Sequence, residues 1–270
     1  METPLLLAGC GKMGRAMLDG WLDRGMAAAD VHVVEPNDSA VAELRGIGVQ
    51  AVTEPEQLPG DLHPTVIMFA VKPQAMDVVA PDYARFVAPD TVFLSIAAGK
   101  PIGYFESLLG DAAAIVRAMP NTPAAVRRGI TVACANSRVS ESQIADCTGL
   151  LEAVGEIAWV DDEGLIDAVT ALSGGGPAYV FLLAECLAQA GIDAGLPEDL
   201  SNRLARVTVA GSGELLHRAS ETPAVLRQNV TSPGGTTAEA LKILMADDGW
   251  QPLLSRAIAA ATARSRELAG

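Results

Sequence analysis

The stretch Ser232–Thr237, which reads Ser-Pro-Gly-Gly-Thr-Thr, holds the residues best suited to bind a small anion. Serine is a common helix cap and proline a common turn residue, so one helix should end before this stretch and another begin within it. The glycine pair lets the backbone approach a ligand closely, and the N–H groups at a helix start attract a carboxylate. A threonine hydroxyl there can hydrogen-bond the reacting group. The same composition also fits an ordinary connection between two helices.

A second glycine-rich stretch, Gly9–Gly14, reads Gly-Cys-Gly-Lys-Met-Gly and follows the apolar run Leu5–Ala8. Apolar residues recur behind it at helical spacing, so we expect a strand, a glycine turn and a helix in that order. This is the context of the dinucleotide fingerprint, whose glycines allow a tight turn, close approach of a pyrophosphate and close helix packing. The expected cofactor contacts in this turn are Gly9, Gly11, Lys12, Met13 and Gly14.

The next expected strand, Val31–Glu35, ends in a carboxylate about 20 residues beyond the fingerprint. An acid at this position accepts hydrogen bonds from the hydroxyls of the adenosine ribose. Glu35 therefore favours NAD over NADP, because a carboxylate repels a 2′-phosphate, and the neighbouring Asn37 can soften that preference. The alternative is a strand-end carboxylate that lies in solvent.

Expected strands and helices then alternate along the first half of the chain. Further strands are expected at Val49–Val52, Thr65–Ala70, Thr91–Ile96, Ala113–Arg117, Gly129–Ala135 and Glu156–Val160. Helices are expected at Ser39–Leu44 and Ser140–Val154. The alternation predicts an α/β fold with a Rossmann-type, mainly parallel sheet that binds ligands at the carboxyl ends of its strands. The candidate cofactor residues at those ends are Ala70, Val71, Lys72, Pro73, Ala97, Ala98, Gly99, Asn121 and Thr122.

Strand signals stop after Val160, so residues 1–160 are expected to form the dinucleotide-binding domain and residues 161–270 an all-α domain. Its helices are expected at Gly164–Leu172, Tyr179–Ala190, Pro197–Arg218 and Gln251–Leu268. The second of these is apolar on nearly every face, and a helical domain of this size can hardly bury it alone. We expect a second chain to cover it in a homodimer, and further assembly of dimers stays open.

The bulk composition excludes several classes of partner. The net charge of −14 and pI near 4.6 argue against a nucleic-acid or membrane surface, while 50% hydrophobic residues suit a proper core. The four cysteines and three histidines are scattered, so we expect a reducing cytoplasm, no disulfide framework and no metal site. No signal peptide is expected, and Tyr179–Ala190 is shorter than the roughly 20 apolar residues that span a bilayer.

Four parts of the chain together resemble pyrroline-5-carboxylate reductases. They are Gly9–Gly14, Val71–Gln74, Met119–Pro123, and the pair Asp167–Tyr179 with Val230–Leu241. The resemblance covers essentially the whole chain, and its last pair is the specific part. It implies a Rossmann domain that carries NAD(P)H and a helical substrate and dimerisation domain. The implied substrate contacts are Ser232, Gly234, Gly235 and Thr237, and the nicotinamide-side loops map onto Lys72, Pro73, Asn121 and Thr122.

The reaction that this resemblance implies is hydride transfer from the dihydronicotinamide to the C=N bond of 1-pyrroline-5-carboxylate, which gives L-proline. The cofactor then carries the difficult step and the protein supplies position and electrostatics. We assign Thr237 the catalytic role of hydrogen-bonding and orienting the imine nitrogen, because a threonine hydroxyl is a poor proton donor. The proton is expected from the substrate or from water.

Several positions depart from the family's pattern, namely Gly175 in place of a serine, Pro55 in place of an asparagine, Arg127-Arg128 in place of Gly-Glu, and the acidic Glu35. They leave the cofactor open between NADP(H), which the resemblance implies, and NAD(H), which Glu35 suggests. Two other functions compete. A β-hydroxyacid dehydrogenase-like oxidoreductase would need a lysine on the first long helix of the helical domain, but Lys242 is the only lysine after Lys100. A non-catalytic NAD(P)-sensing protein is the other alternative.

Overall fold

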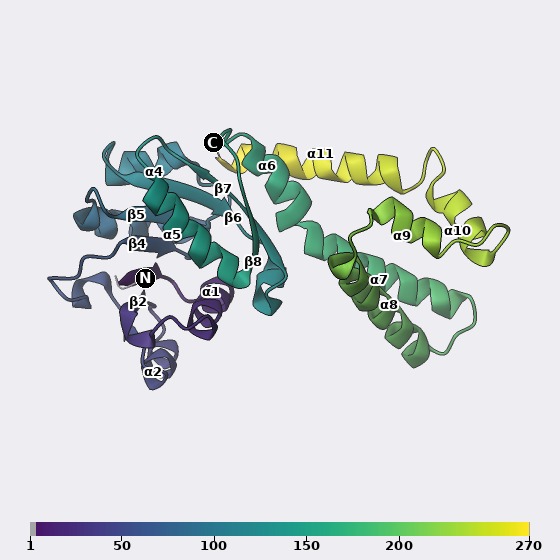
Figure 1. The fold of residues 1–270 in the computed structure, drawn as a ribbon, viewed down its shortest axis with the longest axis horizontal. Coiled ribbons are helices and arrows are strands. Elements are labelled where there is room, and N and C mark those ends of the chain that lie inside the picture. Colours follow the sequence, from purple (N-terminus) through teal and green to yellow (C-terminus); the bar gives the residue numbers. More distant parts are fainter. Residues whose placement is uncertain (1–3, 270) are drawn as a thin grey trace. The chain divides into compact units, whose positions relative to one another are not determined.

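In the computed structural model, which describes residues 4–269, the strands form one eight-stranded sheet in the order β3-β2-β1-β4-β5-β6-β7-β8 (Figure 1). The strands are β1 (Leu5–Ala8), β2 (Val31–Val34), β3 (Gln50–Val52), β4 (Val66–Phe69), β5 (Val92–Ser95), β6 (Ala114–Met119), β7 (Gly129–Ala135) and β8 (Gly155–Trp159). Neighbouring strands run parallel except β6 and β7, which run antiparallel. The segment 120–128 between those two is shorter than the roughly dozen residues that a parallel crossover needs. The mainly parallel α/β sheet expected from the sequence is thus confirmed.

Side chains alternate along each strand, so the sheet presents apolar residues on both faces, and helices cover each face. In β1, Leu5 and Leu7 join one apolar cluster, whereas Leu6 and Ala8 join the other. The first cluster packs against α1 (Lys12–Asp23), α2 (Asp38–Gly46) and α5 (Glu141–Leu151). The second packs against α3 (Met76–Val79), α4 (Ile102–Leu109) and the 3₁₀ segment Ala80–Phe86. The sheet is therefore buried on both sides, as parallel sheets usually are.

The chain divides into two compact units at different residues from those expected. The first unit runs to Gly174 and also takes the segment from Ala261 onward, and the second is Gly175–Ala260. The change from strands to helices at residue 160 does not end the first core, because α6 (Leu165–Val169) packs on the sheet and its Ile166 is 1% exposed. The strands thus end at Trp159, whereas the first compact unit continues to Gly174.

The second unit consists of helices. They are α7 (Gly176–Asp193), α8 (Glu198–Arg218), α9 (Pro223–Asn229), α10 (Thr236–Leu244) and the first part of α11 (Trp250–Ala269). α7 and α8 pack closely, since Ser201 donates its hydroxyl to the Ala188 carbonyl at 2.6 Å and a side chain at Gly191 would collide with that hydroxyl. Small residues therefore set how near the two helices approach.

α7 is longer than the expected helix Tyr179–Ala190 and mostly exposed. A proline in the first turn does not interrupt a helix, so α7 starts at Gly176 and follows directly on the wide turn Thr170–Gly174. The resulting helical run, Leu165–Asp193, is long and apolar enough to cross a membrane by length and composition alone. Its lack of burial equally fits a helix that packs on another protein chain, so length does not decide between the two.

A buried ion pair fixes the segment where strands give way to helices. Arg117 of β6 has a side chain 5% exposed and donates from Nη1 to Oε1 of Glu163 at 2.8 Å. The same carboxylate oxygen accepts the N–H of Ile102 at the start of α4, also at 2.8 Å. Glu163 thus joins the sheet, α4 and the entry to α6.

Glu163→Ala should therefore leave the Arg117 guanidinium buried without its partner. We expect a loss of roughly 2–3 kcal/mol in the free energy of unfolding, below the upper range for buried pairs because the Glu163 side chain is 30% exposed. Urea unfolding at one fixed protein concentration measures it. Glu267→Ala, which removes a surface pair with Arg264, should cost about 0.5 kcal/mol or less. Equal losses in the two variants would contradict the assignment.

Candidate functional site

The glycine turn between β1 and α1 is packed too tightly for side chains at two of its positions. Gly9 has a φ of +86°, and its N–H bonds to the Val34 carbonyl at 2.8 Å. A Cβ at Gly9 would lie 2.7 Å from Cγ1 of Val71, and a Cβ at Gly14 would lie 2.5 Å from the Gly9 carbonyl oxygen. These two glycines therefore have the packing roles expected from the sequence, and they bring the start of α1 against the end of β1.

The middle glycine of the turn faces open space instead. Gly11 is the N-terminal cap residue of α1, makes no side-chain cap bond, and no protein atom lies within 4 Å of where its Cβ would be. The first N–H groups of α1 have no partner within the helix. Open space in front of a helix N-terminus is where a phosphate group binds. The turn thus fits a pyrophosphate.

Glu35 is held beside this turn by two backbone groups. Its Oε2 accepts the N–H of Cys10 at 2.8 Å, and its Oε1 accepts the N–H of Asn37 at 3.2 Å. Burial, and to a lesser degree the Glu35 carboxylate, raises the pKa of the Cys10 thiol to about 11, so this cysteine stays protonated at neutral pH. Asn37 uses its own side-chain oxygen to cap α2, accepting the N–H groups of Ser39 and Ala40 at 3.0 and 3.1 Å.

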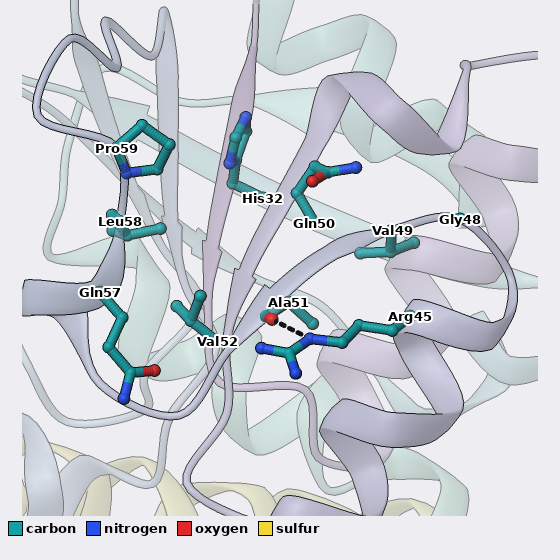
Figure 2. Close-up of a pocket in the computed structure, with 10 residues that line it drawn as sticks. All are labelled: His32, Arg45, Gly48, Val49, Gln50, Ala51, Val52, Gln57, Leu58 and Pro59. Atoms are coloured by element: carbon teal, nitrogen blue, oxygen red, sulfur yellow. Dashed lines mark hydrogen bonds between the residues drawn. The ribbon is translucent and has the colours of Figure 1, made fainter.

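A cavity of about 370 Å³ elsewhere on the sheet holds none of the expected site residues (Figure 2). It lies at β3, the edge strand, where Arg45 of α2 donates from Nε to the Ala51 carbonyl at 2.8 Å. His32 also lines it, and burial lowers the pKa of this histidine. Between residues 4 and 269 no three His, Cys, Asp or Glu side chains lie close enough to hold a metal ion.

The glycine-turn cavity, about 490 Å³, brings together expected cofactor residues from three parts of the chain. From the expected set it is lined by Gly9, Gly11, Glu35, Ala70, Val71 and Lys72. Its other lining residues are Ala8, Val34, Pro36, Thr53, Pro55, Ala75, Val78, Val79, Asp82 and Tyr83. Most of the second group are apolar and follow strand ends, which is a weak sequence signal. The sequence analysis therefore identified the glycine turn, Glu35 and the end of β4 in this lining, and missed the other apolar residues together with Thr53, Asp82 and Tyr83.

A second cavity, which we call the α11 cavity, has a volume of about 540 Å³. Its lining begins at Pro73, the residue after Lys72 of the first cavity. From the expected set it is lined by Pro73, Ala98 and Gly99. Its other lining residues are Gln74, Lys100, Thr170, Ala261, Arg264, Ser265 and Leu268. A Cβ at Gly99 would lie 3.3 Å from the Leu268 carbonyl oxygen. No local pattern in the sequence indicated that the end of α11 returns to this loop.

Lys100 in the α11 cavity is held by a small polar cluster. Its Nζ lies 3.5 Å from Oδ1 of Asp77 and 3.9 Å from the centre of the Tyr104 ring. The Tyr104 hydroxyl donates to the same Asp77 oxygen at 2.5 Å. Burial, together with the hydrogen bond to Asp77, raises the pKa of Tyr104, so this tyrosine is not an acid near neutral pH. The cluster orients Lys100 and supplies no proton.

The structure places other expected residues outside both cavities. Asn121 donates from Nδ2 to the Ser173 hydroxyl at 3.2 Å and accepts the Ile130 N–H at 3.0 Å, so its amide holds the loop before β7. Thr122 begins a 3₁₀ turn, and Ala97 is 4% exposed. Neither these three nor Lys12 and Met13 line either cavity.

The Ser232–Thr237 turn belongs to the second compact unit. Gly234 has a φ of +69°, which favours glycine, and the Gly235 N–H bonds to the Ser232 carbonyl at 3.0 Å. Gly235, not Ser232, is the cap residue of α10, and no side chain caps it. The expected cap role of Ser232 is wrong, because α10 begins only at Thr236, four residues further along the chain. Thr237 lies half-buried in the first turn of α10, where N–H groups attract an anion.

Comparison with known proteins assigns both halves of the chain. Residues 163–268 match the family model described as pyrroline-5-carboxylate reductase dimerisation, and residues 5–99 match NADP oxidoreductase coenzyme F420-dependent. The pyrroline-5-carboxylate reductase of Pseudomonas aeruginosa is 39% identical, over 100% of this chain and 98% of that relative. A solved pyrroline-5-carboxylate reductase from Coxiella burnetii is 33% identical with a TM-score of 0.93, each chain covering 100% of the other. The Plasmodium falciparum pyrroline carboxylate reductase with NADP bound is 28% identical with a TM-score of 0.83, over 100% of this chain and 99% of that one.

The open space at Gly11 gives a direct test of the glycine turn. Gly11→Ala should place a methyl group where the pyrophosphate is expected and weaken dinucleotide binding at least tenfold, or about 1.4 kcal/mol, without lowering the melting temperature. Gly103→Ala is the matched control, since a Cβ at Gly103 would also meet no protein atom within 4 Å. This variant should weaken neither dinucleotide binding nor thermal stability. Titration with NADH and NADPH measures binding. If Gly11→Ala binds both normally, the pyrophosphate lies elsewhere.

Proposed function

Because the chain belongs to the pyrroline-5-carboxylate reductase family, we propose that it reduces 1-pyrroline-5-carboxylate to L-proline with NADH or NADPH, in the cytoplasm. The observation that carries this proposal is similarity along the whole chain to the Pseudomonas aeruginosa reductase, at 39% identity. Two features of the structure also support the proposal, because the glycine-turn cavity fits a dinucleotide and the Ser232–Thr237 turn fits a small carboxylate. Neither rival function has comparable support, and the dehydrogenase alternative also lacks its lysine.

The residues of this chain bind and orient, while the bound dihydronicotinamide supplies the hydride for the C=N bond. The N-terminus of α1 holds the pyrophosphate, and Glu35 accepts the ribose hydroxyls. The backbone N–H groups in the first turn of α10 bind the substrate carboxylate, with Gly234 giving the bend before the helix. The Thr237 hydroxyl bonds the ring nitrogen and fixes which atom faces the hydride donor. The substrate or water brings the proton, because threonine is a weak acid.

An assay with racemic pyrroline-5-carboxylate tests the reaction directly. We expect the purified protein to oxidise NADH or NADPH only when this imine is present, with proline as the product. Oxidation of a 3-hydroxy acid with NAD(P)⁺, without any reduction of the imine, would support the dehydrogenase alternative instead. Dinucleotide binding without turnover of either substrate would support a sensing protein.

Thr237→Ala should slow turnover more than it weakens cofactor binding. Loss of one hydrogen bond to the reacting group should raise the barrier by roughly 1–3 kcal/mol, because a polar group of the substrate is left unpaired. Thr236→Ala is the matched control, since Thr236 is the exposed neighbour in the same helical turn. An unchanged kcat in Thr237→Ala, measured at saturating substrate, would remove Thr237 from the mechanism.

We further propose that Glu35 shifts the cofactor preference towards NADH. Its carboxylate is fixed by the N–H groups of Cys10 and Asn37, so it cannot easily turn away from a 2′-phosphate. Glu35→Ser should raise the kcat/KM ratio of NADPH to NADH roughly tenfold, or about 1.4 kcal/mol. Glu43→Gln, which removes a nearby carboxylate paired with Arg15, should leave the ratio unchanged. A wild-type enzyme that already prefers NADPH strongly would show that Glu35 points away from the ribose.

We also propose that the protein is a homodimer built on the second unit. Several large apolar side chains of this unit are more than 45% exposed within one chain, including Phe181, Leu182, Leu204, Val207, Ile243 and Leu253. Burying each contributes about 1.5–3 kcal/mol, so together they outweigh the net stability of a typical domain. A closed twofold dimer is the simplest arrangement that covers them.

Phe181→Arg should therefore give aggregated or monomeric protein without activity, because the charge falls in an apolar interface. Ile47→Arg is the control, since Ile47 is 44% exposed at the end of α2 in the first unit and should tolerate the change. Light scattering measures the mass. Full activity of wild-type protein at nanomolar concentration with a mass near the 27.9 kDa of one chain would contradict the dimer.

A further inference from the structure

The hydroxyl of Tyr83 has no hydrogen-bond partner. Of the buried side-chain nitrogen and oxygen atoms in residues 4–269, it is the one for which the structure shows none. Tyr83 itself is 0% exposed. Buried polar groups are paired in the great majority of cases, because an unpaired one loses its bonds to water without replacement. This hydroxyl therefore needs an explanation.

The ring of Tyr83 is fixed from two sides, so its hydroxyl cannot turn towards bulk solvent. The Tyr83 and Phe69 rings pack edge to face, with 5.3 Å between their centroids and an interplanar angle of 81°, which is a favoured geometry. Phe86 packs on the Tyr83 ring at 6.3 Å. Both neighbours belong to the apolar cluster beneath the sheet. The hydroxyl is thus held in one place by the core.

Tyr83 also lines the glycine-turn cavity, together with the apolar residues Pro55, Val78 and Val79. Val78 is 77% exposed, so a large apolar side chain of this lining is open to a ligand. Asp82 adds a carboxylate to the same lining. The lining here is therefore mostly apolar, and one of its residues, Tyr83, has a buried hydroxyl without a partner. That combination suits a flat apolar ring that carries a few polar atoms.

The order of the groups along a dinucleotide indicates which of its rings would lie beside Tyr83. If the pyrophosphate lies at Gly11 and the adenosine ribose at Glu35, the group that remains on this side of the turn is the adenine. We propose that the Tyr83 hydroxyl is a hydrogen-bonding contact for the adenine of the bound cofactor. This inference rests on the proposed function only in requiring that the chain binds NADH or NADPH.

The protonation state of Tyr83 suits such a contact. Burial, and less strongly the neighbouring Asp82, raises the pKa of this tyrosine above its usual value. The phenol therefore stays neutral at physiological pH and can donate to a ring nitrogen of the purine or accept from its amino group. A neutral hydroxyl also fits an uncharged base better than a charged side chain, which would cost more to bury.

A buried water molecule bonded to Tyr83 would be the competing explanation, and it predicts effects of opposite sign. If a water satisfies the hydroxyl, Tyr83→Phe breaks a bond in the free protein and lowers its melting temperature. If the adenine satisfies it, Tyr83→Phe removes an unpaired group, so the free protein becomes equally or more stable while the cofactor binds less tightly. The ring and its packing are the same in both cases.

The experiment compares binding of NADH with binding of reduced nicotinamide mononucleotide, which lacks the adenosine half. In Tyr83→Phe we expect the Kd of NADH to rise roughly fivefold to tenfold, the Kd of the mononucleotide to stay unchanged, and the melting temperature of the free protein not to fall. Thr91→Val is the contrasting control. Its hydroxyl is buried but already bonded to the Pro64 carbonyl at 2.8 Å, so the free protein should lose stability and NADH binding should be unchanged.

An unchanged Kd of NADH in Tyr83→Phe overturns the inference, and a lower melting temperature would then point to the water. Equal weakening of NADH and the mononucleotide also overturns it, because Tyr83 would be acting through the shape of the cleft. A failure of the proposed reductase activity would give a different result from a failure of the Tyr83 inference. Wild-type protein that binds NADH but does not reduce the imine removes the reaction without affecting this comparison.

Discussion

The start of α1 can reach the end of β1 only because Gly9 and Gly14 have no Cβ. The Gly14 position lies against the Gly9 carbonyl, and Val71 closes the other side of the turn. This close approach fixes where the first N–H groups of α1 point, and it leaves the face of Gly11 open. It also sets the Cys10 N–H where Glu35 can accept it. The proposed phosphate site and the proposed ribose site therefore both depend on one steric constraint.

The two compact units carry different parts of the chemistry. The first holds both cavities, and the loop Val71–Gln74 contributes to each, Val71 and Lys72 to one and Pro73 and Gln74 to the other. The second holds the Ser232–Thr237 turn and the largest share of exposed apolar side chains. The match of residues 163–268 to a dimerisation model fits an oligomer that covers these exposed side chains.

The sequence predicted the sheet well because apolar alternation and glycine turns are local signals. The bounds of β1, β2 and β7 agree with expectation to within a residue. Features set by distant partners were missed, namely α4 and the antiparallel direction of β7. Site residues divide in the same way. The glycines and Glu35 could be identified from spacing, whereas the end of α11, the structural use of the Asn121 amide and the unpaired Tyr83 hydroxyl depend on three-dimensional packing.

The central claim is that the glycine-turn cavity binds the cofactor and that the Ser232–Thr237 turn binds the imine that the cofactor reduces. A crystal structure with reduced cofactor and a proline analogue tests it most directly. The account predicts the pyrophosphate over Gly11, the analogue's carboxylate on the N–H groups in the first turn of α10, and the Thr237 hydroxyl within hydrogen-bonding distance of the ring nitrogen. An analogue bound away from α10, or a dinucleotide whose phosphates do not meet the N-terminus of α1, would contradict it.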